Sequence, residues 1–405
     1  MVARAMRTQW WSSSRIKAYQ AAKLQHILDH ASRSIPYYRE SLLPRNEEDS
    51  KALLAQFPIM DKAQLQSCPD QFVWGDLPAN KTHRSRSSGS TGEPLTTVFD
   101  HNAWLLVKYA LKARRVLNAT RSLNQRLVVI SETEDNTRET LENVKLADWI
   151  FSTMTMSVTT EVEQNSAALL AYTPTMLYGY PSYLAYLAES ISRSGQEAPA
   201  IPTIFTSSEV LTPFERRNLE AAYQGRVTDV YGSTEFKEIA VQCQEGRYHV
   251  NFESVYVETL EESGPPRLLI TSLVNHAMPM IRFDIGDHAE LAEGDCDCGR
   301  SGPYLQHLHG RSSEILRFPD GSAVTSFTLT TVVGSYPEIK NYSIIQEAPE
   351  RVRILVYADP ELGVDRRAML IQDIAAKLPP GVDISIERLQ HRLPSGKRVA
   401  VSRAF

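Results

Sequence analysis

Residues 126–235 alternate short apolar segments with longer helical patterns, and this alternation limits the folds open to the chain more than any other feature. The run Arg126–Ser131 is typical of a buried strand, and Val227–Glu235 is a β-branched strand that ends in polar residues. Strands that alternate with helices form parallel sheets covered by helices, so we predict an α/β fold. Polar residues at the carboxyl ends of such strands are candidates for a binding site.

A second feature is the segment Ser87–Pro94, which reads Ser-Ser-Gly-Ser-Thr-Gly-Glu-Pro. Glycine lets successive backbone amides approach an anion, and the hydroxyls donate hydrogen bonds to the same oxygens. A flexible connector would have a similar composition. The segment is short, however, and leads into an apolar, β-branched strand, which favours a phosphate-binding loop. It matches neither common nucleotide loop, because no Lys follows Gly92 and the Gly-x-Gly-x-x-Gly spacing is absent.

The composition argues against several classes of protein. The chain has 405 residues, enough for two or three domains, and its 42% hydrophobic and 22% charged residues are typical of globular proteins. A net charge of −5 gives no support to nucleic-acid binding. No apolar run approaches the length of about 20 residues that spans a membrane, and no signal peptide is evident. We expect a cytoplasmic protein that binds neither nucleic acid nor membrane.

Six motifs, in this order, resemble those of the AMP-forming adenylating enzyme superfamily, in particular its phenylacetate–CoA ligase branch. They are the loop at 87–94, Ser207-Ser-Glu209, Tyr231-Gly-Ser-Thr-Glu235, Met280–His288 with its Gly-Asp pair, Gly310-Arg311 and Leu393-Pro-Ser-Gly-Lys397. A Gly-Asp or Gly-Arg pair alone carries no information. The resemblance is specific because the order holds along essentially the whole chain.

The resemblance implies that these motifs bind ATP. Tyr231 would flank the adenine, Asp287 would accept the ribose hydroxyls, and Thr234 would touch the α-phosphate. Glu235 would hold Mg²⁺, and Lys397 would stabilise charge on the α-phosphate during adenylation. The resemblance adds to the ATP-binding set Ser87, Ser88, Gly89, Ser90, Thr91, Gly92, Ser208, Glu209, Gly232, Ser233 and Arg311.

Three positions depart from the pattern of the family. Glu93 stands in the loop where many relatives place Lys, which removes one cation from the pyrophosphate end. Ile285 replaces the Thr of a Thr-Gly-Asp element, and Arg311-Ser-Ser-Glu314 stands where paired acids are frequent. We expect these departures to affect rates rather than the kind of reaction.

Cysteine and histidine spacing suggests a metal site. Three thiolates and an imidazole would satisfy tetrahedral zinc with no open position, which is the structural arrangement. The usual knuckle is Cys-x-x-Cys rather than Cys-x-Cys, so unrelated reduced thiols stay an alternative. The resemblance adds that such residues recur in metal-bearing members of the branch, where zinc would pin loop 292–303 to hairpin 239–257. The predicted zinc ligands are Cys243, His249, Cys296 and Cys298.

The composition becomes strand-rich from about Ser312. Arg351–Val356 alternates charged and apolar residues, a helical spacing follows over 370–378, and Asp383–Ile386 returns to strand. This order predicts a β-β-α-β module. We therefore expect a large N-terminal domain, 1–310, of layered mixed sheets with helices and zinc-pinned loops within 239–303. A small α+β lid domain, 311–405, would carry Lys397 to the site.

The expected function is ATP-dependent activation of a small carboxylic acid as an acyl-adenylate, with release of pyrophosphate. The acyl group would then pass to a thiol, with CoA as the expected co-substrate and Mg²⁺ and a structural Zn²⁺ as cofactors. The alternatives are transfer to a separate carrier protein or an amine, or activation of another small oxyacid. A non-catalytic nucleotide binder is disfavoured because Glu235 and Lys397 are both present. The sequence leaves open which acid is used and whether the chain forms a homodimer.

Overall fold

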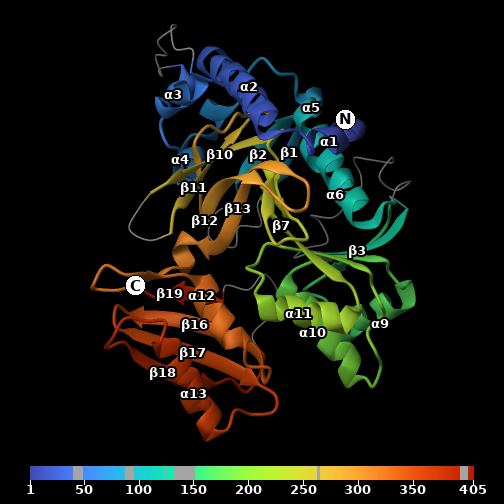
Figure 1. Cartoon of the computed structure of the whole chain (residues 1–405), viewed down its shortest axis with the longest axis vertical. Coiled ribbons are helices and arrows are strands. Elements are labelled where there is room, and N and C mark those ends of the chain that lie inside the picture. Colours follow the sequence, from blue (N-terminus) through green and yellow to red (C-terminus); the bar gives the residue numbers. More distant parts are fainter. Residues whose placement is uncertain (40–48, 87–94, 123, 132–150, 262–264, 393–399) are drawn as a thin grey trace. The chain divides into compact units, whose positions relative to one another are not determined.

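The computed structural model describes residues 1–39, 49–86, 95–122, 124–131, 151–261, 265–392 and 400–405 (Figure 1). The chain divides into two compact units. Unit 1 contains Met1–Ser122, Val230–Leu260 and Pro266–His307. Unit 2 contains Leu123–Asp229, Glu261–Pro265 and Leu308–Phe405. Strand β7 (Arg226–Ser233) gives its first residues to unit 2 and its last residues to unit 1.

The strands of unit 1 form an extended, mostly antiparallel run in the order β10-β11-β12-β13-β9-β8-β7. A separate antiparallel hairpin is made of β1 (Thr82–Arg86) and β2 (Thr96–Asp100). The strand expected after the Ser- and Gly-rich segment is present as β2, whereas the α/β alternation, which describes only the middle of the chain, does not predict the order of the antiparallel run. The strands of the run, apart from β7, are β8 (Lys237–Gln242), β9 (Tyr248–Val250), β10 (Val255–Leu260), β11 (Arg267–Ser272), β12 (Phe283–Asp295) and β13 (Ser301–Arg311).

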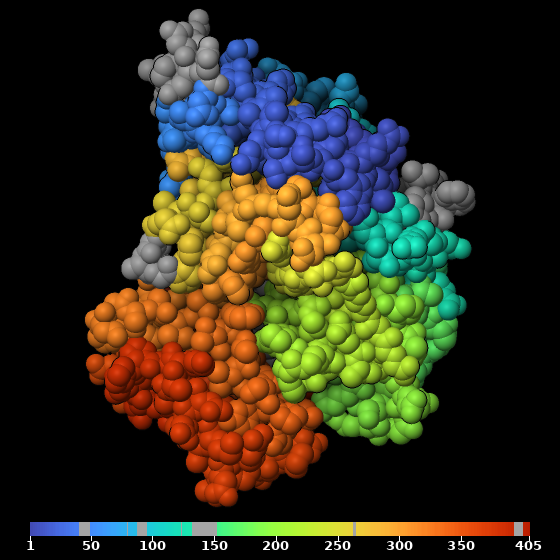
Figure 2. All heavy atoms as spheres, in the orientation of Figure 1, coloured from blue at the N-terminus to red at the C-terminus, as the bar shows by residue number. Residues whose placement is uncertain are grey.

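The N-terminal helices cover part of this sheet. Apolar residues recur at helical spacing over 12–34, which predicts an amphipathic helix. It is present as α2 (Ser13–Ser34), and its apolar side is buried. Lys17 of α2 pairs with Glu293 of β12, and Ile16 lies against Gly302 of β13. In Figure 2 the dark blue atoms of the N-terminal segment lie directly against orange atoms of the chain near residue 300. The other helical segments of unit 1 are α1 (Val2–Thr8), η1 (Pro36–Tyr38), α3 (Ser50–Ala55), α4 (Lys62–Ser67), η2 (Pro69–Phe72), η3 (Ala79–Lys81), α5 (His101–Trp104), η4 (Leu105–Ala110) and α6 (Leu111–Thr120).

Aspartate is a favoured N-cap residue, so the sequence predicts a helix that begins after Asp61, and α4 begins there. Asp61 accepts a hydrogen bond from the backbone N–H of Gln64, and the Gln64 side chain accepts one from the backbone N–H of Asp61. This reciprocal pair is a capping box, which satisfies two N–H groups that the first helical turn leaves without partners. The N-cap prediction for Asp61 is therefore confirmed.

Unit 2 contains the parallel sheet that the alternation predicts. Strand β3 pairs in parallel with β4 and β5, and β5 pairs in parallel with β6. Helices α9, α10 and α11 lie side by side along this sheet (Figure 1). The α/β fold class is thus confirmed. The bounds are β3 (Gln125–Ser131), β4 (Phe151–Ser157), α9 (Val162–Tyr172), β5 (Met176–Gly179), α10 (Pro181–Arg193), β6 (Thr203–Ser207) and α11 (Pro213–Tyr223).

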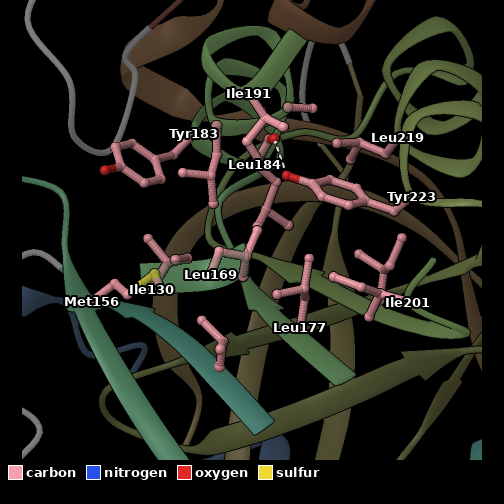
Figure 3. Packing of buried hydrophobic residues seen from close by; sticks show 14 of the residues in the cluster. Ile130, Met156, Leu169, Leu177, Tyr183, Leu184, Ile191, Ile201, Leu219 and Tyr223 are labelled. Atoms are coloured by element: carbon pink, nitrogen blue, oxygen red, sulfur yellow. Dashed lines mark hydrogen bonds between the residues drawn. The ribbon is translucent and has the colours of Figure 1, made fainter. Parts of the chain in front are cut away.

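Helices and sheet of unit 2 share one apolar core. Figure 3 shows Leu169, Leu184 and Tyr223 from the three helices meeting Ile130 and Leu177 from the strands. All are buried, and the Tyr223 hydroxyl donates to the Leu184 carbonyl oxygen over 2.8 Å. Burial raises the pKa of Tyr223, which keeps the phenol protonated and able to donate. A buried Tyr is stable here because its polar end has a partner.

The last part of unit 2 is an α+β module with its own core. The predicted order β-β-α-β is present as β16 (Ile339–Ala348), β17 (Arg351–Ala358), α13 (Val364–Ala375) and β18 (Asp383–Arg388). The sheet order is β18-β17-β16-β19, and the described residues of its buried cluster all fall within 316–401. A domain boundary at residue 310 stays a prediction. The module also contains η5 (Ser312–Glu314), β14 (Leu316–Arg317), β15 (Ala323–Val324), α12 (Ser326–Gly334) and β19 (Val401–Arg403).

Within the ranges that the structure describes, no helix combines the length and the apolar character needed to cross a bilayer.

Candidate functional site

Tyr231 and Asp287 are in direct contact in unit 1. The Tyr231 hydroxyl donates a hydrogen bond to Asp287 Oδ2 over 2.8 Å. Tyr231 lies in β7 and Asp287 in β12, and three strands separate β7 from β12 in the sheet order. In a flat sheet the two strands would lie about 19 Å apart, which is four inter-strand spacings. The sheet must therefore curve, and the curvature brings together two residues that the motifs predict for ATP binding.

The turn before Asp287 is held by hydrogen bonds. Gly286 has a φ of +74°, a conformation that favours glycine. Its N–H donates to Asp284 Oδ1 over 3.0 Å, and Asp284 Oδ2 pairs with Arg267 Nη1 at 2.9 Å. Asp284 is thus fixed from two sides, and it fixes the residue that precedes Asp287.

The N-terminal part of unit 1 adds a second support. The backbone N–H of Met60 donates to the Arg282 carbonyl oxygen over 3.2 Å, and the N–H of Asp284 donates to the Met60 carbonyl oxygen over 2.7 Å. Met60 is fully buried and forms a parallel bridge with Phe283. A residue more than two hundred positions upstream therefore pairs with the start of the strand that contains Asp287.

The turn between β7 and β8 carries Thr234 and Glu235. Ser233 pairs across this hairpin with the first residue of β8. Phe236 is buried against Phe283, with ring centroids 5.9 Å apart, and its N–H donates to Ser233 Oγ over 3.3 Å. Thr234 and Glu235 are half-buried. Phe236 thus anchors the turn that carries Glu235, whose carboxylate is of the type that binds Mg²⁺.

Lys237 lies beside this turn and was not among the residues that the motifs single out. Its ammonium donates to Ser85 Oγ and lies 5.5 Å and 5.6 Å from the ring centroids of Phe99 and Trp104. Gly232 leaves no room for a side chain, because a Cβ there would overlap the Lys237 carbonyl oxygen. The signal in the sequence is the position of Lys237 two residues after Glu235, but its contacts depend on the fold.

The Ser-Ser-Glu motif of unit 2 forms a strained turn at the end of β6. Ser208 has a φ of +73°, which is uncommon outside glycine. The Glu209 carboxylate accepts hydrogen bonds from the Ser182 N–H and hydroxyl over 3.0 Å and 2.8 Å, and so caps the N-terminus of α10. Beside it, Thr206 donates to Asp229 over 2.6 Å, and both side chains are buried.

The Gly-Arg motif has a steric reason for its glycine. Gly310 has a φ of +90°, and a side chain there would overlap Ser326 Oγ and crowd the Glu314 carboxylate. Ser326 Oγ also donates to the His309 carbonyl oxygen over 3.0 Å. Arg311 follows at the end of β13, where η5 begins.

Several predicted residues lie outside the described part of the chain. They are Ser87, Ser88, Gly89, Ser90, Thr91 and Gly92 of the phosphate-loop motif, and Lys397. Of the loop's surroundings, the structure describes β1 before it and Leu95 and β2 after it.

The cysteine and histidine residues predicted to bind zinc come together in unit 1. Their ligand atoms all lie within 4.8 Å of one another, with Cys243 Sγ 3.8 Å from Cys296 Sγ and Cys298 Sγ 3.3 Å from His249 Nε2. A disulfide would need about 2.05 Å between sulfurs. Tetrahedral zinc with Zn–S bonds of about 2.3 Å separates its sulfur ligands by roughly 3.8 Å. The donor set and its spacing fit a zinc ion.

Two tight turns present these ligands. The Cys243 N–H donates to the Arg247 carbonyl oxygen over 2.9 Å, and the Cys296 N–H donates to the Arg300 carbonyl oxygen over 2.8 Å. Arg247 Nη1 then donates to the Asp295 carbonyl oxygen over 2.7 Å, which joins the two turns. The cluster therefore connects the β8–β9 turn to the β12–β13 turn.

The protonation of His249 also suits a metal ligand. Burial, followed by the nearby charges of Arg300 and Arg247, lowers the pKa of His249 to about 4. The imidazole is then neutral at pH 7 and has a lone pair for a cation.

Comparison with known structures defines the class of fold. The chain has the fold of the AMP-forming CoA ligases: it superposes on 2-hydroxyisobutyryl-CoA ligase, solved in its post-adenylation state with 2-HIB-AMP, with a TM-score of 0.82. The two chains are 18% identical, and the match covers 98% of this chain and 91% of that one. Anthranilate CoA ligase AuaEII, in complex with anthranoyl-AMP, matches with a TM-score of 0.58, 14% identity, and coverage of 78% and 64%.

Within this fold class, the chain is similar in sequence to phenylacetate–coenzyme A ligases, as the motifs predict. It is 25% identical over 326 residues to the ligase of Pseudomonas putida, covering 74% of this chain and 72% of that protein. It is 22% identical over 414 residues to the ligase of Thermus thermophilus, covering 92% of each. Protein CapK of Staphylococcus aureus is 26% identical over 165 residues, which covers 40% of this chain and 37% of CapK. No family model matches the chain.

Proposed function

We propose that the chain is an ATP-dependent ligase that activates a carboxylic acid as an acyl-adenylate, releases pyrophosphate, and transfers the acyl group to the thiol of CoA. The observation that carries the proposal is the contact between Tyr231 and Asp287, which belong to motifs 56 residues apart. In the family these two motifs handle the same nucleoside. Similarity to a phenylacetate–CoA ligase over 92% of the chain supports the same function.

The side chains suggest how the nucleoside is bound. Tyr231 offers an aromatic face to the adenine, and its hydroxyl orients Asp287. Asp287 is proposed to accept the two ribose hydroxyls, because a carboxylate can accept hydrogen bonds from several donors at once. Ser208 and Glu209 are proposed for the adenine, and Arg311 for the ribose.

The phosphates need positive charge and hydrogen-bond donors. We assign Ser87, Ser88, Gly89, Ser90, Thr91 and Gly92 to the phosphate chain, together with Gly232, Ser233 and Thr234 of the β7–β8 hairpin. Glu235 would hold Mg²⁺, which neutralises phosphate charge when it is bound. Lys397 would bring an ammonium to the α-phosphate as the carboxylate oxygen attacks and pyrophosphate leaves.

We also propose a structural zinc ion at Cys243, His249, Cys296 and Cys298. All four ligand positions of a tetrahedral ion are provided by the protein, so none remains for a substrate. The ion would hold the β8–β9 turn against the β12–β13 turn. Because β12 contains Asp287, loss of the ion should weaken the nucleotide site indirectly.

ATP–pyrophosphate exchange tests the adenylation step. Radiolabelled pyrophosphate is incubated with the enzyme, ATP, Mg²⁺ and each acid from a panel of aryl and aliphatic acids. We expect exchange that depends on one class of acid and is lost in Lys397→Ala. Lys81→Ala, which removes an exposed lysine at the end of η3, is the matched control and should exchange normally. The absence of exchange with every acid of the panel would refute the proposal.

The acceptor is tested separately with the acid that supports exchange. Product formation is compared for CoA, a carrier protein with a phosphopantetheine thiol, and a simple amine. We expect the thioester of CoA. Faster transfer to a carrier protein or an amine would leave the adenylation step intact and change only the acceptor. A cytoplasmic location stays a prediction, and whether the chain forms a homodimer stays open.

A further inference from the structure

Lys237 has a backbone conformation that residues other than glycine rarely adopt. Its φ is +63°, although it is not glycine. It begins β8 and pairs with Ser233 across the hairpin whose turn carries Glu235. Non-glycine residues in such conformations cluster at functional sites, where the surrounding structure holds them in place. The backbone strain thus points to a role for this side chain.

Contacts with Ser85, Phe99 and Trp104 hold the amino end of Lys237. Its Nζ donates to Ser85 Oγ and lies 5.5 Å from the centroid of Phe99 and 5.6 Å from that of Trp104. Trp104 is itself stacked on His83 at 5.1 Å. Aromatic faces attract a cation, so this environment keeps a positive charge at a defined point.

That point is next to the strands that lead into and out of the Ser- and Gly-rich segment. Ser85 pairs with Thr97 in the β1–β2 hairpin, and β1 ends at Arg86, one residue before the segment starts. On the other side, Lys237 is two residues from Glu235. The Lys237 backbone therefore lies at the turn that carries the proposed Mg²⁺ carboxylate, and its ammonium contacts the strand that leads into the proposed phosphate loop.

The sequence of the Ser- and Gly-rich segment indicates why a further cation would be needed at the phosphates. By the resemblance to the family, Glu93 stands where many relatives have Lys, so the sequence lacks one cation of the family's phosphate loop. We propose that Lys237 binds the β- and γ-phosphates of ATP and the pyrophosphate that leaves, and so supplies the missing cation. An ammonium suits this role because it binds phosphate as a point charge from several directions. The inference rests on the proposed function and adds a residue to its site.

Binding of ATP and of AMP distinguishes phosphate recognition from a purely structural role. AMP lacks the β- and γ-phosphates, so its affinity should not depend on Lys237. Dissociation constants for both nucleotides are measured by calorimetry for wild type, Lys237→Gln, Lys237→Asn and Lys237→Arg. We expect Lys237→Gln to weaken ATP roughly 10- to 100-fold, which corresponds to one charge-assisted hydrogen bond, and to leave AMP unchanged. Lys237→Arg, which keeps the charge, should recover part of the ATP affinity.

The controls separate this inference from the proposed function. Lys81→Gln removes an exposed positive charge and should change neither constant. Lys237→Asn is the second uncharged variant because Asn tolerates a positive φ, and thermal unfolding shows whether each variant is folded. Equal losses for ATP and AMP in a folded variant, or no loss for ATP, would overturn the inference and leave the ligase proposal standing. A wild-type protein that binds neither nucleotide would overturn both.

Discussion

The ion pair between Arg114 and Glu253 should contribute strongly to the stability of unit 1. Arg114 Nη1 lies 2.5 Å from Glu253 Oε1, and the two side chains are only 9% and 6% exposed. The same Glu253 oxygen accepts from Thr8 Oγ1 over 2.6 Å, and Arg114 Nη2 donates to Asn251 Oδ1 over 2.6 Å. One buried pair thus links α1, α6 and the residues after β9. Removing one partner leaves the other charge buried without its counter-ion, which costs about 3–5 kcal/mol.

A double-mutant cycle separates the cost of leaving one charge unpaired from the cost of losing other contacts. We expect Arg114→Met and Glu253→Leu each to destabilise unit 1 by about 3–5 kcal/mol. The double variant removes both charges, so what remains is the loss of the hydrogen bonds to Thr8, Asn251 and the Ala5 carbonyl oxygen, at about 1 kcal/mol each. The double variant should therefore be more stable than either single variant.

Urea unfolding followed by tryptophan fluorescence measures this cycle. Four of the five tryptophans, Trp10, Trp11, Trp74 and Trp104, lie in unit 1, so the signal reports mainly on that unit. A double variant that loses as much stability as the sum of the two single variants would show that the charges do not act as a pair. Single losses below about 1 kcal/mol would show that the pair behaves as if it were exposed to solvent.

Three further predictions concern the metal site, the Gly-Arg motif and pH. Cys298→Ser should abolish stoichiometric zinc measured by atomic absorption and lower the unfolding temperature, whereas Cys68→Ser should do neither; zinc retained in full by Cys298→Ser would refute the assignment. Gly310→Ala should destabilise unit 2, because its φ is +90° and its Cβ would overlap Ser326 Oγ; a melting temperature equal to that of wild type would contradict the steric argument. Burial lowers the pKa of His30 below the usual value of about 6.5, so stability from this group is complete above that value and is lost as the pH falls. The unfolding temperature should fall less between pH 8 and pH 5 for His30→Gln than for wild type. An equal fall in both proteins would exclude a contribution of His30 to the pH dependence of stability.

The sequence predicts those parts of the molecule that local patterns determine. Helix α2 follows from apolar spacing, and the start of α4 follows from Asp61 and Gln64, because both depend on residues within a few positions. The parallel strands β3 and β5 follow from apolar runs between helices. In each case the signal and the structure lie in the same short stretch of chain.

Features that depend on distant parts of the chain could not be predicted in this way. The contact of Tyr231 with Asp287 requires the curvature of a sheet, and the order of its antiparallel strands has no local signature. The motifs identify both residues only through resemblance to a family. Lys237 has no motif of its own, because its environment is made by Ser85 and Trp104, which lie far away in sequence.

The bridge between Met60 and the strand that contains Asp287 limits how far the protein can be truncated from its N-terminal side. Residues near the start of a chain are often trimmed without harm, since termini tend to be loosely attached. Here the backbone of Met60 exchanges hydrogen bonds with Arg282 and Asp284, and its side chain is fully enclosed. A truncated chain that begins after Met60 would therefore be expected to lose nucleotide affinity along with stability, although none of the deleted residues is assigned to the nucleotide.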